Sequence, residues 1–167
     1  NGTLLDDVDL CVDMLNRLLT RFGYTQRYNR TTYREIFGFP IRDYYVRAGF
    51  DFTKDSFDTL AVSYMEDYIP ASAACPLMDG AVNVLTTFGA MGARQVILSA
   101  SLQATLKEQV EGRGILSCFD CLLGLEDIYA KSKVDRGLRF LEENRVDRNR
   151  VVMIGDSVHD FEVAEAL

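Results

Sequence analysis

One stretch decides how this sequence folds: Val151-Val152-Met153-Ile154-Gly155-Asp156-Ser157-Val158-His159-Asp160. Its first four residues are apolar, and such a short run bounded by a glycine predicts a buried β-strand over 151–154. The glycine predicts a turn, which places Asp156 and Asp160 at the carboxyl end of that strand. Because ligands bind at this edge of open α/β sheets, the two carboxylates form a candidate functional site.

The two carboxylates are candidate metal ligands. They stand four residues apart across a strand-to-helix turn, so they can reach one point, and their hard oxygen atoms suit Mg²⁺. The alternative is that one aspartate caps the following helix while the other is solvated. Because the Gly-Asp-x-x-x-Asp pattern is short and common, it leaves both interpretations open by itself.

Three other segments bear on this choice. The chain opens with Asn-Gly-Thr-Leu-Leu-Asp at 1–6, and residues 95–101 predict a strand that ends in hydroxyl side chains. Residues 129–134 carry two lysines and lead into a predicted helix. Each segment alone also has a purely structural interpretation: a helix entry, a strand-end serine acting as a cap, and a pair of surface lysines.

In their order and rough spacing, these four segments resemble the four motifs of the haloacid dehalogenase superfamily of phosphohydrolases. That family carries an Asp-x-Asp-Gly-Thr loop, a strand-end Ser or Thr, a Lys, and a Gly-Asp-x-x-x-Asp turn. The resemblance spans the whole chain, and within the family the chain is similar to the phosphoglycolate phosphatase subgroup, which has a helical cap. It implies a Mg²⁺-dependent phosphatase that hydrolyses a small phosphorylated metabolite through an aspartyl-phosphate intermediate.

The resemblance also implies the roles of individual residues. The nucleophilic aspartate would stand two positions before Asn1, outside this chain. The implied metal ligands are the backbone carbonyl of Asn1 and the side chains of Asp156 and Asp160. The implied phosphate-binding residues are Gly2, Thr3, Ser99, Ala100 and Lys133, of which Ser99 and Lys133 are also catalytic. Lys131 is the rival for the lysine role, and Lys133 is favoured because it stands directly before the helix.

One position departs from the family pattern. The family usually has a second aspartate where this chain has Asn1, and that aspartate protonates the leaving oxygen and activates the attacking water. An amide cannot transfer a proton, so we expect slow turnover of substrates with poor leaving groups. Activated phosphates, an acid on the substrate, or His159 could compensate. Next to Asp160, this histidine is more often a structural group.

Other reactions on the same fold stay open. A dehalogenase needs no metal and fits poorly with two retained carboxylates, whereas a phosphonatase tolerates loss of the second acid but requires a Schiff-base lysine in the cap. The predicted cap holds one lysine, Lys54. A catalytically weak relative is a further alternative. A phospho-receiver switch is disfavoured because its acidic pair lies early in the chain, whereas here the pair comes last.

The pattern of apolar residues divides the chain. Helical spacing predicts an all-helical segment over 8–74, with helices over 8–22, from Thr32 to near Gly38, over 40–48 and over 54–68. After it, helices are predicted over 79–91, 103–111, 134–144 and from 157, alternating with strands over 95–99, 119–123 and 151–154. Such alternation predicts a doubly wound parallel, Rossmann-like α/β core formed by 1–7 and 75–167, with 8–74 as an inserted cap. The first strand and the C-terminal end of such a core are missing, so we expect this chain to be part of a longer product.

Two residues of the predicted cap are candidates for substrate contact. Arg42 could meet a carboxylate of the substrate, and Phe39 lies nearby in the sequence. The alternative is that Phe39 belongs to the core of the cap and Arg42 is solvated.

Composition limits the partners. The net charge of −7 argues against nucleic acid, since no basic face is predicted that would neutralise phosphates. The apolar runs are too short to cross a bilayer, and no signal peptide is visible. Cys118-x-x-Cys121 lacks a second pair for zinc, which favours buried thiols. These features predict a cytoplasmic protein with a small phosphorylated metabolite as its partner, and they leave the oligomeric state open.

Overall fold

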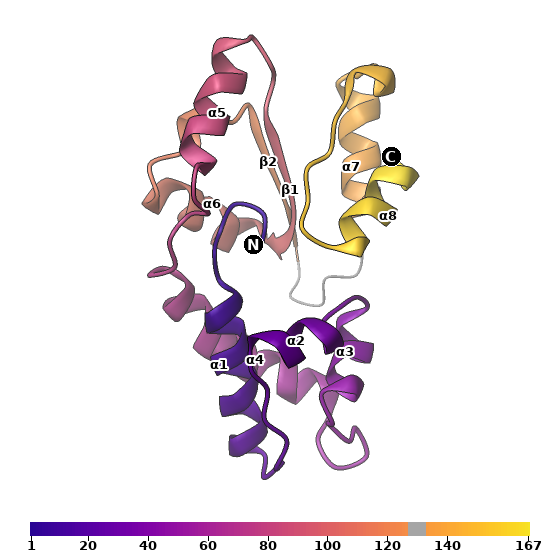
Figure 1. Cartoon of the computed structure of the whole chain (residues 1–167). Helices are drawn as coiled ribbons and strands as arrows, with labels where there is room; N and C mark the ends of the chain where they lie inside the picture. Colours follow the sequence, from indigo (N-terminus) through magenta and orange to yellow (C-terminus); the bar gives the residue numbers. More distant parts are fainter. Residues whose placement is uncertain (127–132) are drawn as a thin grey trace. The chain divides into compact units, whose positions relative to one another are not determined.

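The computed structural model describes residues 1–126 and 133–167, and the chain divides into two compact units (Figure 1). The core unit consists of Asn1–Leu5 and Leu77–Leu167, and the helical unit consists of Asp6–Pro76. The chain therefore leaves the core unit after Leu5 and returns to it at Leu77, where these two residues form an isolated antiparallel bridge. In sequence, the helical unit is an insertion into the core unit.

Every residue of the helical unit is described, and its regular elements are all helices. They are α1 (Val8–Arg21), α2 (Arg30–Ile36), α3 (Ile41–Arg47) and α4 (Phe57–Ser72). The apolar spacing that predicts the first helix is the spacing of its buried face, which consists of Met14, Leu15, Leu18 and Leu19. This face packs with buried tyrosines of α2 and α3 in one hydrophobic core.

Side-chain caps explain where two of these helices begin. The Asn29 side chain accepts hydrogen bonds from the backbone N–H groups of Thr31 and Thr32, so α2 begins at Arg30 rather than at Thr32. The Ser56 hydroxyl accepts a hydrogen bond from the Thr59 N–H, so α4 begins at Phe57, three residues later than the apolar pattern predicts. In both cases a polar side chain, rather than the apolar period, sets the boundary.

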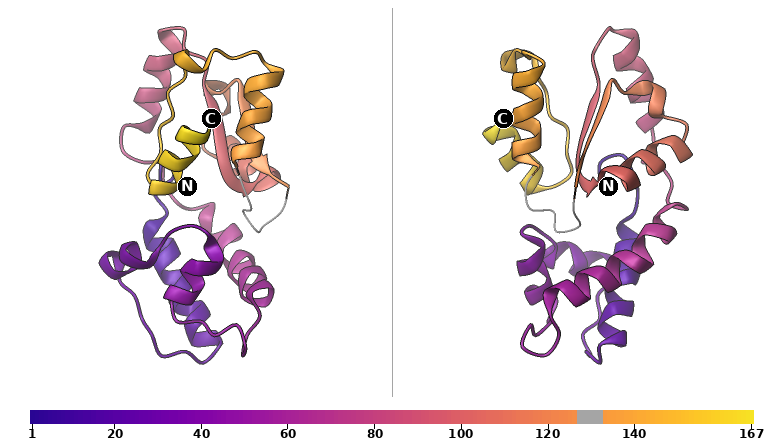
Figure 2. Two further views of the ribbon diagram at one scale, coloured as in Figure 1. Left: turned by 90° about the vertical axis from the view of Figure 1, so that its right-hand side faces the viewer. Right: turned by 180° about the vertical axis from the view of Figure 1, so that it is seen from behind.

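The core unit alternates helices and strands, as its sequence predicts (Figure 2). Its elements are α5 (Ala81–Ala90), β1 (Val96–Leu102), α6 (Gln103–Gly112), the 3₁₀ turn η1 (Leu116–Cys118), β2 (Cys121–Leu125), α7 (Val134–Glu143), the 3₁₀ turn η2 (Arg148–Arg150) and α8 (Val158–Ala166). Strands β1 and β2 pair in parallel, with Val96 opposite Cys121 and Leu98 opposite Leu123. Parallel pairing with a connecting helix is the unit from which doubly wound folds are built.

The strand predicted over 151–154 is wrong. These residues form a coil between η2 and α8, and Val152 and Ile154 are 85% and 63% exposed. A strand needs a neighbour that accepts and donates its ladder hydrogen bonds, and the sheet of the described residues contains β1 and β2 alone. The apolar run has β-strand composition, but among residues 1–126 and 133–167 no strand lies beside it to pair with.

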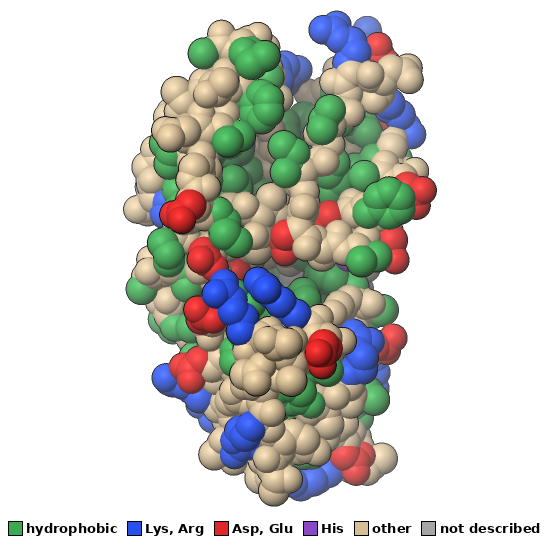
Figure 3. Space-filling model, viewed as in Figure 1, with side chains coloured by type: hydrophobic (Ala, Val, Ile, Leu, Met, Phe, Trp, Pro, Cys, Tyr) green, Lys and Arg blue, Asp and Glu red, His purple; other side chains and the backbone are tan. Residues whose placement is uncertain are grey.

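Exposed apolar side chains gather on two segments of the core unit (Figure 3). On α5 and just after it they are Val82, Val84, Phe88 and Met91, and in and after the coil they are Val151, Val152, Ile154, Val158 and Phe161. The cysteines form no disulfide among the described residues, and Cys118 in η1 and Cys121 in β2 are half-buried rather than buried as predicted. Within residues 1–126 and 133–167, no helix has the length and apolar character needed to cross a membrane.

Candidate active site

The opening loop of the chain meets the turn after the coil through Thr3 and Asp156. The Thr3 hydroxyl donates a hydrogen bond of 2.6 Å to Oδ1 of Asp156. Within the described residues, Oδ2 of this exposed carboxylate accepts no hydrogen bond. One oxygen of Asp156 is therefore held by Thr3, and the other is available to a ligand.

Gly2 makes this close approach possible. Its backbone has φ +76, in the left-handed region that favours glycine, and a Cβ at this position would collide with the Asp156 carboxylate. Its N–H donates to the carbonyl of Leu5 at 2.9 Å. Gly2 thus allows the loop to turn against Asp156, and its amide is engaged within that loop.

Lys133 and Asp160 form the second part of the site. Lys133 is the N-cap residue of α7, and its ammonium group is paired with Oδ1 of Asp160. Both side chains are largely buried, at 8% and 13% exposed. A buried pair of this kind holds both groups in place, because separating them would leave a desolvated charge.

Ser157 fixes the other side of Asp160. Its hydroxyl caps α8 by accepting from the Asp160 N–H, and Oδ2 of Asp160 accepts in return from the N–H and hydroxyl of Ser157. The same oxygen accepts from the Asp156 N–H at 3.2 Å. Both oxygens of Asp160 are therefore engaged by protein donors. The Ser-x-x-Asp spacing of this capping box was visible in the sequence, but sequence reasoning missed the role of Ser157.

These contacts shift the pKa of Asp160. Burial raises the pKa of this carboxyl, but hydrogen bonds from Lys133 and Ser157 outweigh burial and lower it to about 2. Asp160 therefore keeps its negative charge throughout the physiological range and stays paired with Lys133.

Ser99 lies in the middle of β1 and is 8% exposed, because the strand continues to Leu102 instead of ending at Ser99 as predicted. Its hydroxyl oxygen accepts a hydrogen bond from the Ser101 N–H at 3.1 Å, across the half-buried Ala100. Among the described residues, no hydrogen bond joins Ser99 to Asp156 or Lys133. The structure thus brings together the opening loop, Lys133 and the two aspartates, and it leaves Ser99 within β1 of the same unit.

The remaining candidate residues contact side chains other than those of the site described above. Nδ1 of His159 lies 3.3 Å from Oε2 of Glu162, one turn along α8. In the helical unit, the guanidinium of Arg42 lies 4.5 Å from the centre of the Phe52 ring, and Phe39 packs edge-on against Phe37. Lys131 lies outside the described residues.

The side chains at this site fit a hard cation in part. Among the described residues, no cluster of three or more His, Cys, Asp or Glu side chains could hold a metal ion. The available carboxylate oxygen of Asp156 is a suitable ligand for Mg²⁺, whereas the oxygens of Asp160 are occupied by Lys133 and Ser157. A divalent ion here would need Asp156, backbone carbonyls and water, and direct ligation by Asp160 would require one of its present donors to move away.

Comparisons with known proteins identify the family and the fold. A family model described as haloacid dehalogenase-like hydrolase matches residues 1–167. A predicted phosphatase from Clostridium acetobutylicum has a similar fold, with a TM-score of 0.83 at 19% identity, covering 99% of this chain and 77% of that one. A predicted phosphoglycolate phosphatase from Haemophilus somnus gives a TM-score of 0.78 at 16% identity, covering 99% and 78% of the two chains. Protein tyrosine kinase A of Mycobacterium tuberculosis gives 0.82 at 25% identity, covering 99% and 76%. No curated protein matches this chain.

Proposed function

Because this chain belongs to the haloacid dehalogenase-like hydrolase family, we propose that it is a Mg²⁺-dependent phosphatase that hydrolyses a small phosphorylated metabolite. One observation carries the proposal: both aspartates of the turn at 155–160 are tied to distant candidate site residues. Asp156 accepts a hydrogen bond from Thr3, and Asp160 pairs with Lys133. A phosphoryl-transfer site needs positive charge and fixed donors around the phosphoryl oxygens. Lys133 and Ser99 are the groups of this chain that meet that need.

In the proposed reaction, the Lys133 ammonium group binds a phosphoryl oxygen, and the Ser99 hydroxyl donates to another. Asp160 holds Lys133 in position, since its carboxylate pairs with the ammonium group and is itself fixed by Ser157. Thr3 orients Asp156 in the same way. By resemblance, an aspartate preceding Asn1 attacks the phosphorus and forms an aspartyl-phosphate that water hydrolyses. Mg²⁺, when bound by Asp156 and the Asn1 carbonyl, neutralises charge on the phosphoryl group.

The helical unit serves as a cap in this proposal, with Arg42 and Phe39 as its candidate substrate contacts. The stacking of Arg42 on Phe52 leaves its charge available to an anion, because a guanidinium on a ring face keeps its N–H donors at the edge. The substrate is a small metabolite, with no nucleic-acid or membrane partner, and the location is cytoplasmic. The net charge of −7 supports the exclusion of nucleic acid.

The phosphonatase alternative is less well supported. A Schiff-base lysine must lose its proton to attack a carbonyl. Lys54 instead donates to the Phe22 carbonyl at 3.0 Å and lies 4.5 Å from the centre of the Tyr24 ring. Both contacts hold the amine of Lys54 against its own helical unit.

The test is phosphate release by the full-length protein from sugar, acid and nucleotide monophosphates, with Mg²⁺ and with a chelator. We expect turnover of at least one substrate that requires Mg²⁺ and is abolished by Asp156→Ala, with the circular dichroism spectrum unchanged. Undiminished turnover in Asp156→Ala would remove this turn from the active site. Absence of turnover on every phosphate ester would contradict the proposed function.

A further inference from the structure

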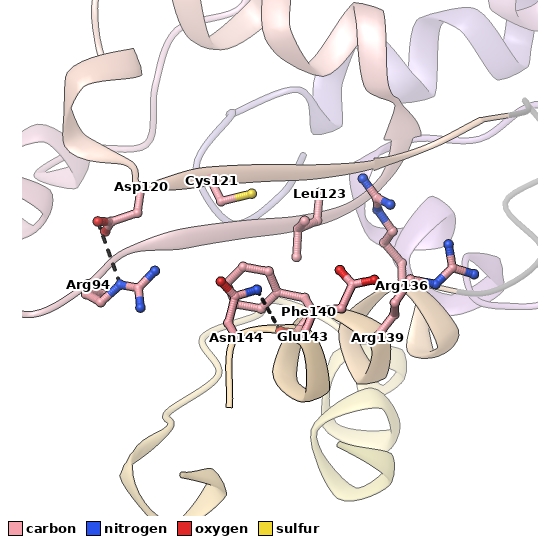
Figure 4. A pocket seen from close by; sticks show the side chains of 9 residues that line it. All are labelled: Arg94, Asp120, Cys121, Leu123, Arg136, Arg139, Phe140, Glu143 and Asn144. Atoms are coloured by element: carbon pink, nitrogen blue, oxygen red, sulfur yellow. Dashed lines mark hydrogen bonds and ion pairs between the residues drawn. The ribbon is translucent and has the colours of Figure 1, made fainter. Parts of the chain in front are cut away.

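A second candidate site lies in the core unit. A cavity of about 310 Å³ is bounded by β2 and the segments before it on one side and by α7 on the other (Figure 4). Its apolar wall includes Leu123 and Phe140, and three arginines line it, Arg94, Arg136 and Arg139. None of Thr3, Ser99, Lys133, Asp156 and Asp160 contributes to its lining.

The three arginines are not equivalent. Arg94 lies at one end of the cavity, with its Nε 3.8 Å from Oδ1 of Asp120, whose Oδ2 accepts from the Gln95 N–H. Arg136 and Arg139 lie at the other end, both from α7 (Figure 4). Neither forms an ion pair with any described residue, and Glu143, which also lines the cavity, is likewise unpaired there. With Asp120 and Glu143 as its acidic residues, the lining of the cavity keeps a net positive charge from the three arginines.

Arg136 adds a second observation. Its Nε is buried and has no hydrogen-bond partner within the described part of the chain. A buried N–H donor without an acceptor is costly and rare in folded proteins, and a water molecule or a ligand oxygen that reached it would relieve that cost. A guanidinium at the wall of a cavity points to a ligand that carries oxygen acceptors.

From this geometry we infer that the cavity binds a small oxyanion, a carboxylate or phosphate group, through Arg136 and Arg139. The planar donor fork of arginine matches two oxygens of such a group, and a charge-assisted pair is stronger than a neutral hydrogen bond. The volume is at the lower end of pockets that hold small molecules, about 300–1,000 Å³, so the ligand is a metabolite rather than a peptide. Leu123 and Phe140 would contact its apolar part.

This site stands independently of the proposed phosphatase activity. Arg136 stands three residues after Lys133, yet Lys133 does not line the cavity. Binding can be measured whether or not the protein hydrolyses any phosphate ester.

Isothermal titration calorimetry with inorganic phosphate and with succinate, at constant ionic strength, tests the inference. Arg139→Gln is the main variant because Arg139 is exposed and its replacement leaves the buried packing intact. Arg136→Gln is the second variant, and Arg148→Gln on η2 is the matched control, since it removes the same charge outside the cavity. We expect the two cavity variants to weaken binding by about tenfold or more and the control to stay within about twofold.

The two probes separate the sources of the oxyanion. Loss of phosphate binding in Arg139→Gln would assign a phosphorylated ligand, and loss of succinate binding would assign a carboxylate ligand; either result supports the site. Phosphate binding at the proposed active site is the same in all variants, so it does not change the difference in phosphate affinity between the cavity variants and the original protein. Equal affinities of the original protein, Arg139→Gln and Arg148→Gln for both probes would overturn the inference.

Discussion

The Thr3 hydroxyl donates a hydrogen bond of 2.6 Å to Oδ1 of Asp156, although 153 positions separate the two residues in the sequence. The contact joins the opening loop of the chain to the turn that carries the candidate metal ligand. The resemblance implied that Thr3 binds phosphate, whereas in the structure its hydroxyl donates to the carboxylate of Asp156. Thr3 is thus a positioning residue for Asp156.

Thr3→Val should therefore lower kcat/KM for the preferred phosphate ester by about tenfold, since a hydrogen bond to a charged group contributes about 1.5–3 kcal/mol. The apparent Kd for Mg²⁺ should rise as well, because the carboxylate loses its fixed orientation. Thr3→Ser keeps the hydroxyl and is the matched control. An unchanged Mg²⁺ affinity in Thr3→Val would show that this hydrogen bond does not position the ligand.

The lysine at the start of α7 should matter for both stability and turnover. Lys133→Met removes the partner of a largely buried carboxylate, and we expect a loss of roughly 3 kcal/mol of unfolding free energy in urea titrations. At a temperature where the variant is folded, kcat/KM should also fall, and the fall should correspond to several kcal/mol of lost transition-state stabilisation.

Lys131→Ala is the comparison for that experiment, and we expect it to change stability by no more than about 0.5 kcal/mol. The two lysines compete for the same role in the family pattern. A large loss of turnover in Lys131→Ala with a small one in Lys133→Met would mean that the register assigned to this loop is wrong.

Acid should weaken the fold through Asp160. Its pKa is about 2 in the folded protein against an ordinary value of 3.8, so its contribution is present above the ordinary value and lost as pH falls towards 2. The shift corresponds to about 2 kcal/mol. Urea unfolding at several pH values should show that the stability difference between the original protein and Asp160→Asn shrinks by that amount between pH ~5 and ~2. A difference that is constant over this range would mean that Asp160 is not stabilised as a carboxylate.

Restoring an acid at the first position tests the departure from the family pattern. Asn1→Asp in the full-length protein should raise turnover of alkyl phosphates about tenfold or more, because general-acid catalysis contributes about 10²–10⁴-fold where the leaving group is poor. Aryl and acyl phosphates should gain little, since their leaving groups need little protonation. Equal rates for the two variants across all leaving groups would mean that another acid, such as His159 or the substrate, already acts.

Much of this protein was determined by sequence patterns that act locally. Apolar residues at helical spacing predicted α1 and α7, because a helix buries whichever side chains recur on one face. The alternation of helices and strands after Cys75 predicted parallel pairing, and β1 and β2 pair in this way. Local chemistry also placed Ser99 in a strand, although β1 continues three residues beyond it, to Leu102.

Tertiary structure decided what depends on a partner from elsewhere in the chain. The run at 151–154 has strand composition but forms an exposed coil, because strand formation requires a neighbour and no local pattern supplies one. Likewise, the sequence offered Asp156 and Asp160 as equal metal ligands, and the fold made them different. Asp160 is enclosed by Lys133 and Ser157, whereas Asp156 keeps one oxygen available, and which donors reach a carboxylate is fixed only when distant segments pack together.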